Sequence, residues 1–200
     1  LGFADVAEVA IGADLCTIDE AKDFMEEVPT KIPFMGTSCC PAWSVMAKKL
    51  FPQQAECISM AMTPMVLTAR LIKKEKPNAR ICFVGPCAAK KLTSLPDNPE
   101  DSFNSASADA RGFAASGGVA QAVVNAIKKM DPDREVKVAS AQGLADCKKM
   151  MMMAKAGKYN GYLLEGMACP GGCIAGAGTL ADPAKSVAML NKYKNEATMK

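Results

Sequence analysis

Two patterns of apolar and polar positions alternate along this chain: short apolar runs and longer stretches with helical spacing. The short runs predict buried strands at residues 6–10, 32–35, 79–84, 135–141 and 159–164. The longer stretches predict helices at residues 17–27, 41–50, 61–74, 113–129, 146–156 and 182–194. Alternating strands and helices are typical of a mostly parallel sheet with helices on both faces, so we expect an α/β fold.

The first predicted helix carries two acids that decide how it is interpreted. Thr17 would cap this helix, with Glu20 completing a capping box. Glu20 and Asp23 then share one helix face, either as solvated surface or as a carboxylate relay for protons. The methionine run at 150–153 and Trp43 are expected in the core. Four cysteines are also expected to be buried: Cys16, Cys57, Cys82 and Cys147.

Composition narrows the classes of chemistry and partner. Two hundred residues suit one domain or two small lobes, and the net charge of +3 is too dispersed for a nucleic-acid surface. No apolar run is long enough to span a membrane. The absence of histidine excludes imidazole catalysis and most zinc enzymes. Nine cysteines, an odd number, without a signal peptide indicate a reducing cytoplasm rather than a disulfide framework.

Cysteines follow three of the predicted strands. Cys169 and Cys173, separated by Pro-Gly-Gly, lie in a glycine-rich loop after the strand at 159–164. Such a loop lets the backbone approach a bulky inorganic group and direct N–H groups toward it. Because two thiols leave a metal centre incomplete, further ligands must come from elsewhere in the chain.

The other candidate ligands follow the strands at 32–35 and 79–84. Cys39 and Cys40 precede Pro41, at a helix N-terminus where the dipole should favour thiolates, and Cys87 follows a Gly-Pro pair. Carboxyl ends of parallel strands lie at one edge of a sheet, so we expect these loops to meet. Four thiolates are the ligand set of a cubane iron–sulfur cluster, and zinc would accept the same set.

Three motifs carry a resemblance to a known family. Residues 37–43 (TSCCPAW), 85–91 (GPCAAKK) and 165–173 (EGMACPGGC) resemble, in order, the signature motifs of the iron-only ([FeFe]) hydrogenase catalytic domain. Residues 12–18 and 113–119 also resemble family segments. On this resemblance the whole chain, residues 1–200, is one H-cluster domain that lacks the N-terminal part of the family domain. The fold it implies has two small lobes of mostly parallel sheet, with the metal site in the cleft between them.

The resemblance implies an H-cluster, in which a [4Fe-4S] cubane is joined to a di-iron subcluster with CO, CN and a bridging dithiolate. Nine residues would serve this site: Cys40, Cys87, Cys169 and Cys173 as cubane ligands, Cys39 as the proton-transferring acid, Lys90 as a donor to a cyanide, and Ser38, Met167 and Phe113 around the two irons.

Three positions depart from the usual family pattern. Gly85 replaces a methionine in the second motif, and Thr93 stands where a glutamate of the proton path is usual. The serine of that path corresponds to Met60, with Ser59 adjacent. The Gly-Pro-Cys form is similar to the sensory branch of the family, and the segment between the second and third motifs is short.

Three functions therefore stay open. The first is a ferredoxin-type hydrogenase that reversibly oxidises hydrogen, and the second is a hydrogen or redox sensor with low turnover. The third is a hydrogenase-like iron–sulfur assembly protein with a cubane alone. The expected partners are ferredoxin or fused iron–sulfur or signalling modules, together with cluster maturation proteins. We expect no nucleic acid and no membrane, and a cytoplasmic location in an anaerobic organism.

Overall fold

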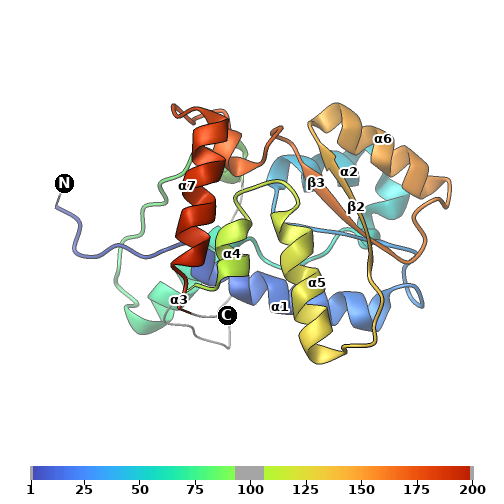
Figure 1. Cartoon of the computed structure of the whole chain (residues 1–200), viewed down its shortest axis with the longest axis horizontal. Helices are drawn as coiled ribbons and strands as arrows, with labels where there is room; N and C mark the ends of the chain where they lie inside the picture. The colour runs from blue at the N-terminus through green and yellow to red at the C-terminus, as the bar shows by residue number, and fades with distance from the viewer. Residues whose placement is uncertain (1, 93–105, 199–200) are drawn as a thin grey trace.

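A computed structural model describes residues 2–92 and 106–198, with only the backbone of residues 91 and 92 (Figure 1). Its α-helices are α1 (Ala10–Glu27), α2 (Pro41–Leu50), α3 (Pro64–Glu75), α4 (Ala108–Gly112), α5 (Gly118–Met130), α6 (Leu144–Lys155) and α7 (Pro183–Asn195). Its strands are β1 (Met35–Gly36), β2 (Lys137–Gln142) and β3 (Tyr162–Met167). Short 3-10 helices are η1 (Pro52–Cys57), η2 (Ala88–Leu92) and η3 (Cys173–Ala175). None of the helices in these ranges is long and apolar enough to cross a membrane.

The three strands form one parallel sheet in the order β1-β3-β2, with β3 at the centre. Helices α2 and α6 cover one face of the sheet, and α5 with α1 covers the other (Figure 1). Side chains alternate along β3, so Gly166 faces Trp43 of α2 while Glu165 faces the start of α5. The expected mixed α/β class with a parallel sheet flanked by helices is confirmed.

Buried apolar residues form two clusters, and among the described residues the one sheet lies in the first of them rather than one sheet in each. The first, the sheet core, surrounds β3 and includes Trp43, Leu163 and Leu164. The second, the helical core, is built from helices and loops together with Met167 at the end of β3. Its buried members are Ala13, Leu15, Cys16, Cys39, Leu67, Leu71, Ala106, Ala110, Phe113, Val119, Ala122 and Met167.

Two of the predicted strands are wrong. Residues 79–84 belong to no strand or helix, and Val84 is 83% exposed. Residues 6–9 form no strand and lead into α1, which begins at Ala10, and Val6 is 88% exposed. Both runs have the composition of strands, but a strand also needs a partner for its backbone groups. Neither run pairs with another strand within the described parts of the chain.

Helix α1 begins seven residues before the predicted start, so Thr17 is not its cap. The Thr17 hydroxyl instead donates to the Ala13 carbonyl inside the helix (2.8 Å). The earlier start is favoured by packing on α3, because Gly12 lies directly against the carbonyl of Pro64 and the side chain of Thr68. Tertiary burial here outweighs the local capping signal.

The core assignments are mostly confirmed. Trp43 is fully buried, and so are Met150 and Met151, whereas Met152 of the same run is 56% exposed. Among the four cysteines expected to pack as small apolar residues, three are buried: Cys16, Cys57 and Cys147. The fourth, Cys82, is exposed because it lies in the segment that forms no strand.

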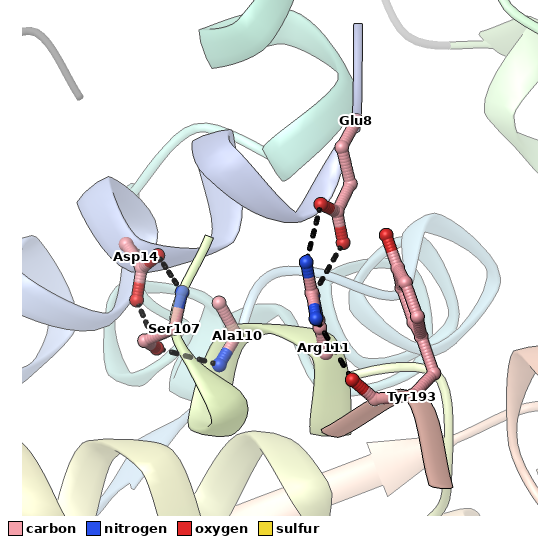
Figure 2. Close-up of polar contacts among 6 residues, drawn as sticks. All are labelled: Glu8, Asp14, Ser107, Ala110, Arg111 and Tyr193. Carbon is pink, nitrogen blue, oxygen red and sulfur yellow. Dashed lines mark hydrogen bonds and ion pairs between the residues drawn. The ribbon is translucent and has the colours of Figure 1, made fainter. Parts of the chain in front are cut away.

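Polar contacts fix α4 between the start of the chain and α7 (Figure 2). Arg111 binds both carboxylate oxygens of Glu8, donates to the Tyr193 carbonyl (2.8 Å), and lies 3.8 Å from the Tyr193 ring centroid. Asp14 of α1 accepts from the backbone N–H and the hydroxyl of Ser107, the α4 cap. These contacts hold in place the turn that follows α4.

Gly166→Ala tests the packing of α2 on β3. An added Cβ would overlap the Trp43 ring, which is fully buried and held by a 2.9 Å bond from Nε1 to the Thr37 carbonyl. We expect the free energy of unfolding, measured by urea denaturation, to fall by about 3 kcal/mol. The same change in a Trp43→Leu background should cost much less, and equal costs in both backgrounds would contradict this packing account.

Candidate metal centre

The first motif leaves the sheet at the carboxyl end of β1. The Thr37 N–H donates to the Leu164 carbonyl of β3 (2.9 Å), which continues the parallel pairing to the edge of the sheet. Cys40 is then the N-cap of α2, and Pro41 occupies the first helical turn. Here the structure confirms the predicted bounds of the helix and the place of Cys40 at its start.

The third motif leaves the same edge of the sheet at the end of β3. Cys169 follows the strand, and Cys173 begins η3. Gly171 and Gly172 between them have φ of +88° and +93°, which side chains with a Cβ rarely adopt. A Cβ on Gly172 would also lie 2.6 Å from the Ser116 nitrogen. The glycines are therefore required both for the turn and for close approach to the chain after α4.

The second motif reaches this loop without a strand to carry it. The Gly178 N–H donates to the Pro86 carbonyl (3.0 Å), and Gly176 also packs on Pro86. Cys87 follows directly, half-buried, before η2. The expected meeting of the three cysteine loops is found, but a loop–loop contact brings in Cys87 rather than the edge of a sheet.

The four predicted cubane ligands interact electrostatically. Burial raises the pKa of Cys169, and the nearby thiolates of Cys40 and Cys87 raise it further. Burial also raises the pKa of Cys173; Lys90 opposes this, while Cys40, Cys87 and Cys169 add to it. Bringing like charges this close costs free energy that a bound cation or cationic cluster would offset.

This donor set fits a [4Fe-4S] cluster. Four thiols from three converging segments match its ligand requirement, and each binds a different iron, so they lie farther apart than ligands of a single ion. In the parts of the chain that the structure describes, no three Cys, Asp or Glu side chains are placed to share one metal ion. The ligand assignment itself stays a prediction.

The residues predicted around the two irons lie together. Cys39, Phe113 and Met167 are all buried members of the helical core, and Cys40 packs against it. The Lys90 ammonium donates to the carbonyl of Cys39 (3.3 Å) and is therefore directed toward the same region. A thiol, a cation and two large apolar side chains thus line one region beside the four thiols.

Glu20 is fully buried next to this region, so it is not part of a solvated helix face. Its Oε1 accepts from the backbone N–H of Ser38 (2.7 Å) and from the Ser38 hydroxyl (3.1 Å). Its Oε2 has no hydrogen-bond partner, although the Ser59 side chain is close enough to lower its pKa. Burial dominates and raises the pKa of Glu20 to about 7. A carboxyl group with such a pKa can both accept and donate a proton near neutral pH.

Ser38 and Ser59 extend this group on either side. The Ser38 hydroxyl is 2.6 Å from the Ala61 carbonyl, so when it donates there its oxygen can accept from a protonated Glu20. The Ser59 oxygen accepts from the Ala61 N–H (3.1 Å), which leaves its proton available. Ser59 is buried and interacts with Glu20, whereas Met60 is 80% exposed, so Ser59 rather than Met60 faces the Glu20 carboxyl group.

Two other predictions for this region, on Cys39 and Thr93, have different outcomes. Cys39 was expected to favour the thiolate, but burial raises its pKa well above the usual range and the Glu20 charge raises it further. The helix N-terminus does not compensate for that loss of solvation. Thr93, the residue in place of the usual glutamate, lies outside the described residues.

Glu165 was missed as a separate site residue. Its carboxylate is fully buried and accepts from the backbone N–H groups of Gly117 (2.9 Å) and Ala120 (3.2 Å) at the start of α5. The signal was available, because a charged residue within an otherwise apolar strand demands a partner.

Comparison with known proteins agrees with these motifs. A sequence profile described as "Iron only hydrogenase large subunit, C-terminal domain" matches residues 1–94 and 91–177. The chain belongs to this family. The two matched ranges overlap at residues 91–94, between the second and third motifs.

Individual relatives are distant. The periplasmic [Fe] hydrogenase large subunit of Nitratidesulfovibrio vulgaris is 25% identical over 262 residues, covering 94% of this chain. This chain spans 62% of that relative's length, which is less than two thirds. A cytosolic Fe-S cluster assembly factor of Candida dubliniensis is 27% identical over 112 residues, covering 52% of this chain and 19% of that protein.

The fold also matches solved structures of the family. An apo [FeFe]-hydrogenase from Chlamydomonas reinhardtii, in a variant form, superposes with a TM-score of 0.71 at 19% identity. The match covers all of this chain and 77% of the other. At this level of identity the likeness shows the shared fold.

Glu20→Gln tests the buried carboxyl group through the pH dependence of stability. Glu20 has its pKa raised from 4.5 to about 7, so between these values it ionises in the unfolded chain but stays protonated in the folded one. Wild-type stability should therefore fall by about 3 kcal/mol from pH 4.5 to 7 relative to the variant. Urea denaturation at a series of pH values measures this difference.

Glu26→Gln provides the control, because Glu26 is exposed and its hydrogen bond with Lys31 lowers its pKa. Ionisation of Glu26 therefore changes the free energy of unfolding below pH 4.5, outside the range from pH 4.5 to 7. Parallel wild-type and Glu20→Gln profiles between pH 4.5 and 7 would contradict the raised pKa of Glu20.

Proposed function

We propose that this chain is the H-cluster part of an iron-only hydrogenase and supports reversible oxidation of hydrogen and reduction of protons. The observation that carries the proposal is the meeting of three cysteine loops beside a buried carboxyl group. Membership of the family supports the class of reaction. We propose for this chain the activity of the longer proteins in the family.

Four thiolates would hold the [4Fe-4S] cubane, namely Cys40, Cys87, Cys169 and Cys173. When bound, the joined di-iron subcluster with CO, CN and dithiolate ligands supplies the redox and hydride chemistry. Lys90 would orient and neutralise an anionic ligand, because its ammonium already points toward the carbonyl of Cys39. Met167 and Phe113 would exclude water from this side of the site.

The protein would move protons along a chain of side chains from the surface. Asp23 is half-buried on the same face of α1 as Glu20, and the two carboxyl groups interact electrostatically. Ser59 would relay a proton to Glu20, and Ser38 would pass it toward the Cys39 thiol. The raised pKa of Cys39 keeps its sulfur protonated at neutral pH, as an acid at this position requires.

A sensor with low turnover is the second candidate, and Gly85 favours it. A Cβ at this position would lie 2.5 Å from the Phe83 ring, so this ring occupies the space that the usual methionine side chain would need. An assembly protein with a cubane alone would need neither the buried Glu20–Ser38 pair nor Lys90. Ferredoxin or fused modules, maturation proteins and a cytoplasmic location remain part of the proposal.

Infrared spectroscopy after anaerobic maturation tests the proposed function. We expect CO and CN stretching bands, iron in excess of a single cubane, and measurable hydrogen turnover. Turnover far below that of a matured hydrogenase assayed beside it would favour the sensor. If the protein contains iron and sulfide for one cubane but shows no CO or CN bands, an assembly protein is the remaining function.

Ser59→Ala tests the proton relay, with Met60→Ala as the matched control one residue away. Loss of the Ser59 hydroxyl should lower hydrogen turnover about tenfold or more while the infrared bands stay unchanged. Met60 is exposed, so its truncation should leave both unchanged. If Met60→Ala lowered turnover and Ser59→Ala did not, the proton path would pass through Met60 instead of Ser59.

A further inference from the structure

Glu165 is a buried charge that the proposed proton path does not use. It lies in the middle of the central strand β3, fully buried, without an ion-pair partner among the described residues. Its oxygens accept instead from the N–H groups of Gly117 and Ala120, and the Val119 N–H adds a further hydrogen bond. Gly117, the N-cap of α5, has no side chain that could cap the helix itself. Glu165 therefore caps α5 from a neighbouring strand.

The turn that Glu165 holds also packs against the loop that carries Cys169 and Cys173. Within this turn, residues 112–118, the Ala114 carbonyl accepts from Ile174 (3.0 Å), and the Ser116 N–H donates to the Gly171 carbonyl (3.2 Å). Gly172 packs directly on the backbone of residues 114–116. The loop that carries Cys169 and Cys173 is thus aligned against the 112–118 turn.

We infer that Glu165 is a positioning residue that sets the geometry of the loop at 169–173 through the 112–118 turn. The carboxylate fixes the turn from one side, and the cysteine loop rests on its other side. Phe113, at the start of the turn, lies in the helical core beside Cys39 and is placed by the same contact.

Glutamine cannot replace this carboxylate. Its amide offers one acceptor oxygen, while its NH₂ group would face a backbone N–H at the start of α5. Glu165→Gln should therefore release one of the helix N-terminal donors and loosen the turn. Glu165→Ala removes both oxygens and leaves a space beside α5 that a small carboxylate such as formate can enter.

Amide hydrogen exchange on the metal-free chain tests the coupling without any cluster. In Glu165→Gln, exchange at residues 114–118 and 171–176 should speed up at least tenfold, while β2 and α6 change little. Glu165→Ala should show the same pattern, and added formate should restore protection at both segments. Uniform acceleration over the whole chain, unchanged exchange at 171–176, or no rescue by formate would each overturn the inference.

Asp146→Asn is the matched control, since Asp146 is an exposed acid in the first turn of α6, paired with Lys149. It should leave exchange at both segments unchanged. On matured protein, Glu165→Gln should retain less iron than wild type. This part rests on the proposed function: a wild type without cluster would refute that function, whereas the exchange result would still decide the role of Glu165.

Discussion

The parallel pairing of β3 between β1 and β2 is the constraint on which the site depends. It places the ends of β1 and β3 at one edge, so the Cys40 and Cys169 segments leave the sheet side by side. Gly36 pairs with Leu164, and the next residue, Thr37, donates its backbone N–H to the Leu164 carbonyl. A shift of one residue in this register would turn Glu165 away from α5 and place it against α2.

Close backbone contacts carry the rest of the arrangement. Gly166 lets α2 lie on the sheet, and Gly172 lets the cysteine loop lie on the turn before α5. Cys87 depends on a similar contact between Pro86 and Gly178. The loops of the site are thus held mainly by main-chain contacts. The cysteine side chains are not needed for these contacts.

The sequence predicted those parts of the fold that depend on local signals. Pro41 marked the start of α2, and the helical spacing predicted α7 at residues 182–194 to within one residue at each end. The failures came where distant contacts decide: residues 79–84 lack a partner strand, and α1 begins early because Gly12 packs on α3.

The candidate site shows the same division. Spacing and resemblance located the thiols, Lys90 and Glu20. They could not distinguish Ser59 from Met60, because the choice depends on which side chain faces α1. They also missed Glu165, whose partners come from a turn nearly fifty positions away in the chain.

The pairing of Met35 with Leu163 has a consequence for the order of events during biosynthesis. Nearly the whole of the described chain must leave the ribosome before β3 can enter the sheet between its neighbours. Contacts of such long sequence separation form late, since closing the intervening loop costs entropy first. Until then the Cys40 segment cannot lie beside the loop that carries Cys169 and Cys173, so this part of the site forms only after β3 has paired with β1.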